Sequence, residues 1–173
     1  MAFTNSRLPE EAAQRPSRGA HKADPATAAP THPVRVYYED TDAAGIVYYA
    51  NYLKFAERGR TEMMRGFGLE HRSLGEAADT VFTVRRCTVD YRVPARLDDA
   101  LTVETRVCAI GGATLSLDQR ICRGAEIVAA LDVLLACVSR AGRPRRVPPA
   151  LRAALTTDRD KSSQAAPVVQ KTP

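Results

Sequence analysis

A chain of 173 residues, of which 45% are hydrophobic and 26% charged, has the length and balance of one globular domain with a core of its own. No stretch reaches the roughly 18 uninterrupted apolar residues that a membrane-spanning helix needs, which excludes an integral membrane protein. The N-terminus also lacks the apolar run of a secretory signal, so we expect a cytoplasmic protein.

The net charge of +5 is unevenly distributed along the chain. Residues 34–139 hold thirteen basic and fifteen acidic side chains, whereas residues 140–173 hold eight basic and two acidic ones. Four of these basic residues form a short cluster: Arg140, Arg143, Arg145 and Arg146. Such a cluster is either a solvated edge or a site for the phosphates of a nucleic acid or a cofactor. No aromatic residues are interleaved with it, which argues against binding of single-stranded nucleic acid.

Both ends of the chain are predicted to be disordered. Residues 1–33 contain five of the eleven prolines and eight alanines but few bulky apolar side chains, so they cannot offset the entropy of ordering. Residues 156–173 have the same character. The folded domain is therefore predicted over residues 34–155.

The first predicted elements are a strand and a long helix. Val34–Tyr38 alternates and is rich in β-branched and aromatic residues, which predicts a short strand. A helix is predicted from about Tyr49 to Arg65, because apolar or small residues recur there every three or four positions. Gly66 and Gly68 mark its C-terminal end.

The remaining segments predict a sheet. After a short helix around Ser73–Ala78 come four strand-like segments separated by turn residues: Thr80–Tyr91, Ala100–Ile110, Thr114–Arg123 and Glu126–Ser139. A short helix follows from Pro148 through Leu155. One long helix and a nearly continuous set of strands predict an α+β fold, in which an antiparallel sheet of about five strands wraps around the helix.

The four cysteines predict no metal or redox chemistry. Cys87, Cys108, Cys122 and Cys137 contain no C-x-x-C pair, and each lies in a segment rich in Val, Ile and Leu. A disulfide framework would be unusual in a cytosolic chain of this size. We interpret all four as buried thiols that pack as small apolar groups.

Residues 37–52 carry the chemistry of the chain. Five of the six tyrosines lie here, together with three carboxylates that precede the predicted helix start. Helix N-termini attract negative charge and donate hydrogen bonds to a developing oxyanion. Asp42 could activate water or attack a carbonyl carbon. The alternative is that Asp40 and Asp42 only shape the loop through Asx-turns.

This segment resembles a known motif. The pattern Tyr38-x-Asp40-Thr41-Asp42-x-x-Gly45-x-Val47-Tyr48-Tyr49-x-Asn51-Tyr52 is similar to that of the 4-hydroxybenzoyl-CoA thioesterase-like branch of the hotdog superfamily, and within it to the YbgC-type acyl-CoA thioesterases. The later runs Thr88–Tyr91 and Pro94–Asp99 are also typical of that group. The resemblance covers about Val34 to Pro149 and implies a hotdog fold.

The resemblance also implies an activity and its residues. Family members hydrolyse acyl-CoA to the free acid and CoA without a metal or redox cofactor. By position, Asp42 is the catalytic carboxylate, and the backbone N–H of Tyr49 polarises the thioester carbonyl. The expected substrate-binding residues are Gly45, Val47, Tyr48 and Asn51. Glu57, on the helix, is interpreted as a solvated or paired side chain.

Two departures from the family pattern affect the site. Many YbgC-type proteins have His where this chain has Tyr49, which changes the shape and acidity of the pocket. The turn Ile110–Ala113 lacks the basic residues that hold CoA phosphates in some relatives. Phosphate binding is therefore expected at Arg140 or Arg143, or at the neighbouring Arg145–Arg146 pair.

The family also implies partners. We expect a homodimer or homotetramer with active sites at a subunit interface, acting on acyl-CoA or on an acyl carrier protein. The alternative is an interaction protein associated with the Tol-Pal cell-envelope system, with weak or no catalysis. Nucleic-acid binding through residues 140–146 ranks below both, because the motif outweighs the charge.

Overall fold

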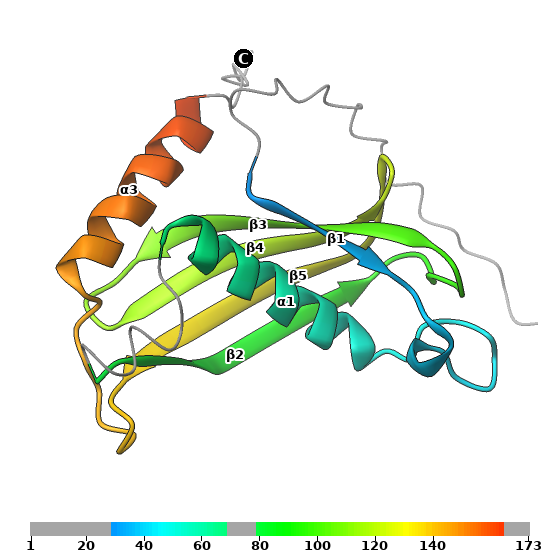
Figure 1. Ribbon diagram of the computed structural model, residues 1–173, viewed down its shortest axis with the longest axis horizontal. Coiled ribbons are helices and arrows are strands. Elements are labelled where there is room, and N and C mark those ends of the chain that lie inside the picture. The colour runs from blue at the N-terminus through cyan, green and yellow to red at the C-terminus, as the bar shows by residue number, and fades with distance from the viewer. Residues whose placement is uncertain (1–28, 69–78, 165–173) are drawn as a thin grey trace, which may run out of the picture.

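The computed structural model describes residues 29–68 and 79–164 and contains one antiparallel sheet that curls around a long helix (Figure 1). In chain order its elements are β1 (Thr31–Arg35), the 3-10 helix η1 (Tyr38–Asp40), α1 (Asn51–Gly66), β2 (Val81–Tyr91), β3 (Ala100–Ile110), β4 (Thr114–Arg123), β5 (Glu126–Val138) and α3 (Pro149–Gln164). The strand order is β1-β3-β4-β5-β2, so β1 and β2 form the two edges of the sheet. The predicted arrangement of a five-stranded sheet around one helix is confirmed.

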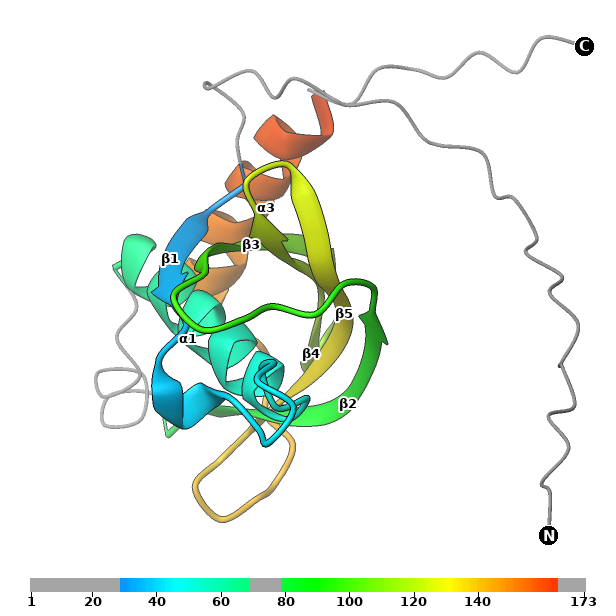
Figure 2. The same cartoon turned by 90° about the vertical axis from the view of Figure 1, so that its right-hand side faces the viewer.

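α1 lies against the concave face of the sheet, which wraps around it in the end-on view (Figure 2). The predicted apolar face of the helix is the buried one, and it includes Tyr52, Phe55, Ala56 and Met63. Gly59 lies on the same face, where a Cβ atom would come within 2.5 Å of Val103 Cγ1 of β3. The glycine therefore permits the close packing of α1 on the sheet.

Alternate residues of the central strands face α1. On β4, Leu115, Leu117, Gln119 and Ile121 are buried, while Ser116, Asp118 and Arg120 between them are partly exposed. This period of two is what a strand with one face on the core requires. α3 then contacts β3 and buries Leu151 and Leu155, which closes the core at one end of α1.

A polar pair crosses the buried layer between α1 and β4. The guanidinium of Arg60 donates a 2.7 Å hydrogen bond to Gln119 Oε1, and Arg60 also pairs with Glu57. Gln119 is fully buried, and its amide donates to the Ala56 carbonyl and to Thr105 Oγ1, each at 2.9 Å. Glu57 is thus a paired residue, as the sequence predicted.

Three boundaries differ from the predictions. β1 spans Thr31–Arg35 rather than Val34–Tyr38, because residues 31–35 pair with residues 100–104 and the chain then turns into η1. The prediction of disorder is wrong for residues 29–33, which the structure describes. It is also wrong for residues 156–164, because α3 continues to Gln164 rather than ending at Leu155. The helix predicted around Ser73–Ala78 lies outside the described residues.

Candidate active site

Asp42 lies in a tight loop between η1 and α1. An isolated antiparallel bridge joins Thr41 to Val47, and the Asp42 N–H donates a 2.9 Å hydrogen bond to the Ile46 carbonyl. The Gly45 N–H donates back to the Asp42 carbonyl at 2.9 Å, and Gly45 has a φ of +72°. Residues with side chains rarely adopt that conformation. Gly45 therefore shapes the loop that presents Asp42.

The Asp42 carboxylate is exposed and only half engaged by protein. Its Oδ1 accepts a 2.8 Å hydrogen bond from the Ala44 N–H, which is an Asx-turn. Within residues 29–68 and 79–164, no protein group donates to Oδ2. The interpretation of Asp42 as a residue that only shapes the loop therefore accounts for Oδ1 alone. Oδ2 is available to water or to a substrate.

Asp40 has a different role from Asp42. It is buried, and its Oδ2 accepts a 2.9 Å hydrogen bond from the Tyr37 N–H, which stabilises η1. Its backbone carbonyl accepts two further hydrogen bonds, from the Tyr48 N–H and from Asn51 Nδ2, each at 2.9 Å. Asp40 is thus structural and leaves Asp42 as the exposed carboxylate of the pair.

The start of α1 offers free backbone donors next to this loop. The Asn51 N–H donates to the Tyr48 carbonyl at 2.8 Å, but in the described part of the chain the N–H groups of Tyr49 and Ala50 donate to no protein acceptor. Ala50, the N-cap residue, provides no side-chain cap. Uncapped N–H groups at a helix start carry the positive end of the helix dipole. They are suited to a carbonyl oxygen that gains negative charge.

Tyrosine rings surround the helix start. The rings of Tyr48 and Tyr49 lie 4.6 Å apart, and both side chains are substantially exposed. Tyr91, at the end of β2, donates a 3.0 Å hydrogen bond to the Tyr49 carbonyl and packs edge-on against the Tyr49 ring at 6.4 Å. Tyr91 also contacts Tyr52, whose pKa is raised by burial. Tyr91 belongs to the motif Thr88–Tyr91, but the sequence alone does not indicate that its side chain reaches the helix start.

Two predicted substrate-binding residues lie beneath the loop rather than on its surface. Val47 is 3% exposed and belongs to the core, and its N–H donates to the Ala95 carbonyl at 2.8 Å. Asn51 is 5% exposed and uses its amide to hold Asp40. In this chain both residues support the loop from inside. Asp42, Gly45, Tyr48 and Tyr49 are together at its surface.

The arginine cluster lies far from Asp42. Arg140 and Arg143 belong to the loop between β5 and α3, at the end of the sheet where Val81 of β2 pairs with Val138 (Figure 1). Tyr91, at the other end of β2, is beside Tyr49. Ten residue steps separate Val81 from Tyr91, which is roughly 33 Å at about 3.3 Å per residue. Arg140 and Arg143 therefore do not share a site with Asp42 within one chain, and their expected role in phosphate binding stays a prediction.

The arginine loop, defined as residues 139–146, is well anchored. The Arg143 N–H donates to Ser139 Oγ, and the Ser139 N–H donates to the Arg143 carbonyl. Asp79 accepts from the Arg140 N–H at 3.1 Å and from the Arg145 guanidinium at 2.8 Å, and these hydrogen bonds lower its pKa. No ion pair within the described residues engages the side chains of Arg140, Arg143 or Arg146.

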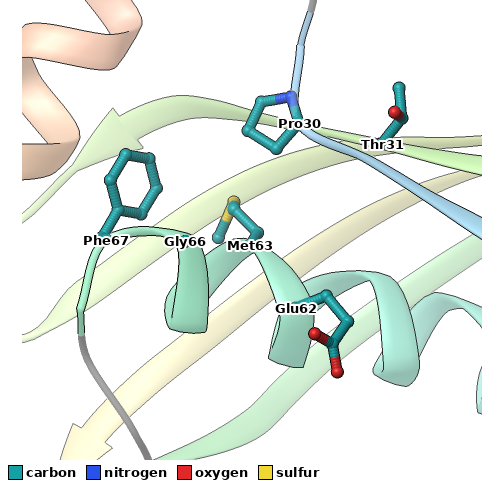
Figure 3. Close-up of a pocket in the computed structure, with 6 residues that line it drawn as sticks. All are labelled: Pro30, Thr31, Glu62, Met63, Gly66 and Phe67. Carbon is teal, nitrogen blue, oxygen red and sulfur yellow. The ribbon is translucent and has the colours of Figure 1, made fainter.

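A cavity of about 270 Å³ lies at the C-terminal end of α1, the end remote from Asp42 (Figure 3). Its lining residues are Pro30, Thr31, Glu62, Met63, Gly66 and Phe67. The lining is mostly apolar, and its one carboxylate, Glu62, is paired with Arg65. The exposed Asp42 loop lies at the opposite end of the helix.

The cysteines are all unpaired, and their environments differ. Cys122 and Cys137 are buried as predicted, and Cys87 is half-buried. Cys108 is exposed at an irregularity of β3, so its predicted burial is wrong. In residues 29–68 and 79–164, no three His, Cys, Asp or Glu side chains are grouped to hold a metal ion. In the same ranges, no helix has the length and apolar character needed to span a membrane.

Comparison with known proteins identifies close relatives. The model of a family described as the thioesterase-like superfamily matches residues 36–155. The acyl-CoA thioesterase YbgC of Haemophilus influenzae is 47% identical over 106 residues, which are 61% of this chain and 78% of the relative. The acyl-CoA thioester hydrolase YbgC of Escherichia coli O6:H1 is 44% identical over 118 residues, or 67% of this chain and 87% of the relative. The crystal structure of a probable thioesterase from Bartonella henselae superposes with a TM-score of 0.67 at 36% identity, covering 68% of this chain and 98% of that one.

Proposed function

Because the chain belongs to the thioesterase-like superfamily and is a YbgC-type thioester hydrolase with a hotdog fold, we propose that it hydrolyses acyl-CoA to the free acid and CoA with Asp42 as the catalytic carboxylate. The observation that carries this proposal is the exposed Asp42 loop, which has a free carboxylate oxygen and leads directly into a helix start with free N–H donors. A carboxylate and an oxyanion-binding donor are the two groups that thioester cleavage requires.

In the proposed reaction, the thioester carbonyl oxygen accepts a hydrogen bond from the Tyr49 N–H. The Asp42 carboxylate then either attacks the carbonyl carbon or removes a proton from a water molecule that attacks it. In both routes the carbon–sulfur bond breaks and CoA leaves as a thiolate, which is then protonated. Direct attack leaves a mixed anhydride on Asp42, and water hydrolyses it to restore the carboxylate. The two groups together complete the reaction, and we propose that it uses no metal or redox cofactor.

We propose that the active form is a homodimer joined through β2, or a homotetramer built from such dimers. β2 is an edge strand of eleven residues, and Thr83, Val84, Arg85 and Arg86 are exposed along it. A long strand edge with free backbone groups pairs readily with another strand. The other edge strand, β1, has only five residues and includes Pro33, which has no N–H to donate. β2 is therefore the better edge for a second copy.

We also propose a cytoplasmic location. All four cysteines are free, as expected where thiols are kept reduced. We propose an acyl carrier protein as the alternative carrier to CoA, because both present the same thioester. The sequence features that support the alternative, a Tol-Pal-associated interaction protein, are the long N-terminal segment and the basic C-terminal tail. Residues 1–28 and 165–173 lie outside the described residues, and the comparisons do not favour that alternative.

Release of free thiol from a panel of acyl-CoAs tests the proposal. Wild type should turn over at least one acyl-CoA, and Asp42→Asn should lower kcat by at least about a hundredfold, the lower end of what general acid–base groups contribute. Glu39→Gln is the matched control, because Glu39 is an exposed carboxylate of the same segment. A folded Asp42→Asn protein with wild-type turnover would contradict the proposed role of Asp42. Single turnover in ¹⁸O-labelled water that puts label into the Asp42 carboxylate would establish direct attack, because activation of water by Asp42 leaves both of its oxygens unlabelled.

A further inference from the structure

We infer that Tyr91 is a positioning residue for the oxyanion-binding start of α1, because its hydroxyl holds the peptide unit that joins Tyr49 to Ala50. The inference rests on the proposed function, in which the thioester carbonyl accepts a hydrogen bond from the Tyr49 N–H. Figure 1 shows the end of β2 beside the start of α1, and there the Tyr91 hydroxyl donates a 3.0 Å hydrogen bond to the Tyr49 carbonyl. In this role Tyr91 contacts no reacting atom and acts through the backbone.

The Tyr49 carbonyl lies outside the regular hydrogen bonding of α1. An α-helical bond would run to it from the Leu53 N–H, but that N–H donates to the Ala50 carbonyl at 3.2 Å. Among the described residues, no backbone N–H donates to the Tyr49 carbonyl, and its donor is the Tyr91 hydroxyl. The orientation of this peptide unit therefore depends on a side chain from β2 and not on the helix.

The Tyr49 carbonyl and the Ala50 N–H belong to one rigid group. A trans peptide unit is planar, and its C=O and N–H point in opposite directions. The Tyr91 hydroxyl on the carbonyl side therefore fixes the direction of the Ala50 N–H and leaves that N–H open. A hydrogen bond to the carbonyl also polarises the unit, which strengthens its N–H as a donor.

The held peptide unit supplies a second donor beside the Tyr49 N–H. The first N–H groups of a helix point out of its N-terminal end, and those of Tyr49 and Ala50 donate to no protein acceptor in the described part of the chain. The turn that presents them is closed by the 2.8 Å hydrogen bond from the Asn51 N–H to the Tyr48 carbonyl. An oxyanion is stabilised most by donors that are already aligned when its charge develops. Tyr91 provides this alignment.

Tyr91 is itself held in place. Its backbone pairs with Ala129, a buried residue of β5. Its ring lies 5.5 Å from the ring of Tyr52, which is buried and whose hydroxyl accepts a 2.9 Å hydrogen bond from the Ala95 N–H. Partial burial raises the pKa of the Tyr91 phenol, so the hydroxyl keeps its proton at neutral pH. The helix start therefore has a fixed and protonated donor behind it.

Tyr91→Phe tests the inference, because it removes the hydroxyl and keeps the ring that packs on Tyr49 and Tyr52. We expect kcat for acyl-CoA to fall at least about tenfold, while KM stays within about twofold of wild type, because the donor acts mainly in the transition state. Tyr37→Phe is the matched control, since it removes the hydroxyl of an exposed tyrosine outside this contact. Wild-type kcat in a folded Tyr91→Phe protein would overturn the inference. A rise in KM alone would also overturn it, because the hydroxyl would then bind substrate directly.

Binding of two CoA analogues separates positioning from a general disturbance of the site. S-trifluoroacetonyl-CoA has a ketone that adds a nucleophile and then presents an oxyanion, whereas S-propyl-CoA has no carbonyl group. Calorimetry should show that Tyr91→Phe weakens binding of the ketone at least about tenfold and leaves binding of the thioether unchanged. Equal weakening of both ligands would contradict a positioning role, and so would wild-type affinity for the ketone.

The proposed function and this inference fail in distinguishable ways. Wild type that releases no thiol from any acyl-CoA contradicts the proposed function, and with it the inference. Turnover that Asp42→Asn abolishes but Tyr91→Phe leaves at the wild-type rate contradicts only the inference. Urea unfolding of each variant confirms that it is folded under the assay conditions.

Discussion

Asn51 donates a 2.9 Å hydrogen bond from its side-chain amide to the backbone carbonyl of Asp40, which joins the first residue of α1 to the segment that carries Asp42. The Tyr48 N–H donates to the same oxygen. The Asp42 loop is therefore held to the helix from beneath. The position of the carboxylate relative to the free N–H groups of the helix start depends on this attachment.

Replacing Asn51 should weaken both the fold and catalysis. Asn51→Leu keeps the volume but removes the donor from a buried position, which should lower the free energy of unfolding by about 1–2 kcal/mol. We expect kcat to fall with little change in KM, because the substitution disturbs the Asp42 loop and not the residues that contact CoA. Urea unfolding and thiol release measure the two effects. Lys54→Ala, at an exposed position one turn further along α1, should leave both unchanged.

Gly59 should not tolerate a side chain. In Gly59→Ala the new Cβ would meet Val103 Cγ1 at 2.5 Å, and we expect the free energy of unfolding to fall by about 1–3 kcal/mol. Gly66→Ala is the matched control, because nothing lies within 4 Å of its Cβ position and alanine favours the helix. Adding Val103→Ala to Gly59→Ala should recover part of the loss. Equal stabilities of the two glycine variants would contradict this account of the packing.

Asp79 should make part of the stability depend on pH. Its folded-state pKa is lowered by hydrogen bonds from the Arg140 N–H and the Arg145 guanidinium. A lowered pKa contributes stability that is present above the unfolded-state value, about 3.9, and is lost as the pH falls through the folded-state value. Wild type should therefore be more stable than Asp79→Asn at pH 6, and the difference should shrink towards pH 3. Urea unfolding across this range measures it, and a constant difference would contradict the assignment.

A charge on β2 should separate the proposed dimer. Val84 is an apolar residue with 47% of its surface exposed on this edge strand, and it is followed by the exposed Arg85 and Arg86. Val84→Arg would therefore add two further like charges near the twofold axis. We expect a shift from dimer to monomer by light scattering, together with loss of thiol release. Thr31→Arg, on the opposite edge strand β1, should leave the dimer intact. If the two substitutions had the reverse effects, the dimer would form through β1 instead.

The sequence predicted the elements of the core well because each has a clear period. The apolar face of α1 and the bounds of β3 and β4 follow directly from spacings of three to four and of two residues. β1 was misplaced because Val36, Tyr37 and Tyr38 resemble strand residues, yet the Asp40 carboxylate binds the Tyr37 N–H and turns the chain into η1. A local side-chain hydrogen bond outweighs strand propensity here.

The site could be predicted only in part from the sequence. The motif predicted the segment around Asp42, and the resemblance also implied substrate-binding roles for Val47 and Asn51, which are buried in this chain. The distance of the arginine loop from Asp42 depends on the direction and order of the strands. The sequence pattern around Arg140 contains neither the direction nor the order of the strands. It could therefore not predict that the arginine loop and Asp42 lie at opposite ends of the sheet.

The difference between the two edge strands also limits how many copies of the chain can associate through strand pairing. A sheet with two equally receptive edges would recruit a new copy at each end without limit and grow into a fibre. Here β1 is short and interrupted by Pro33, so a dimer joined through β2 presents only poor edges at both of its ends. In the proposed dimer, growth by strand pairing would therefore stop at two copies.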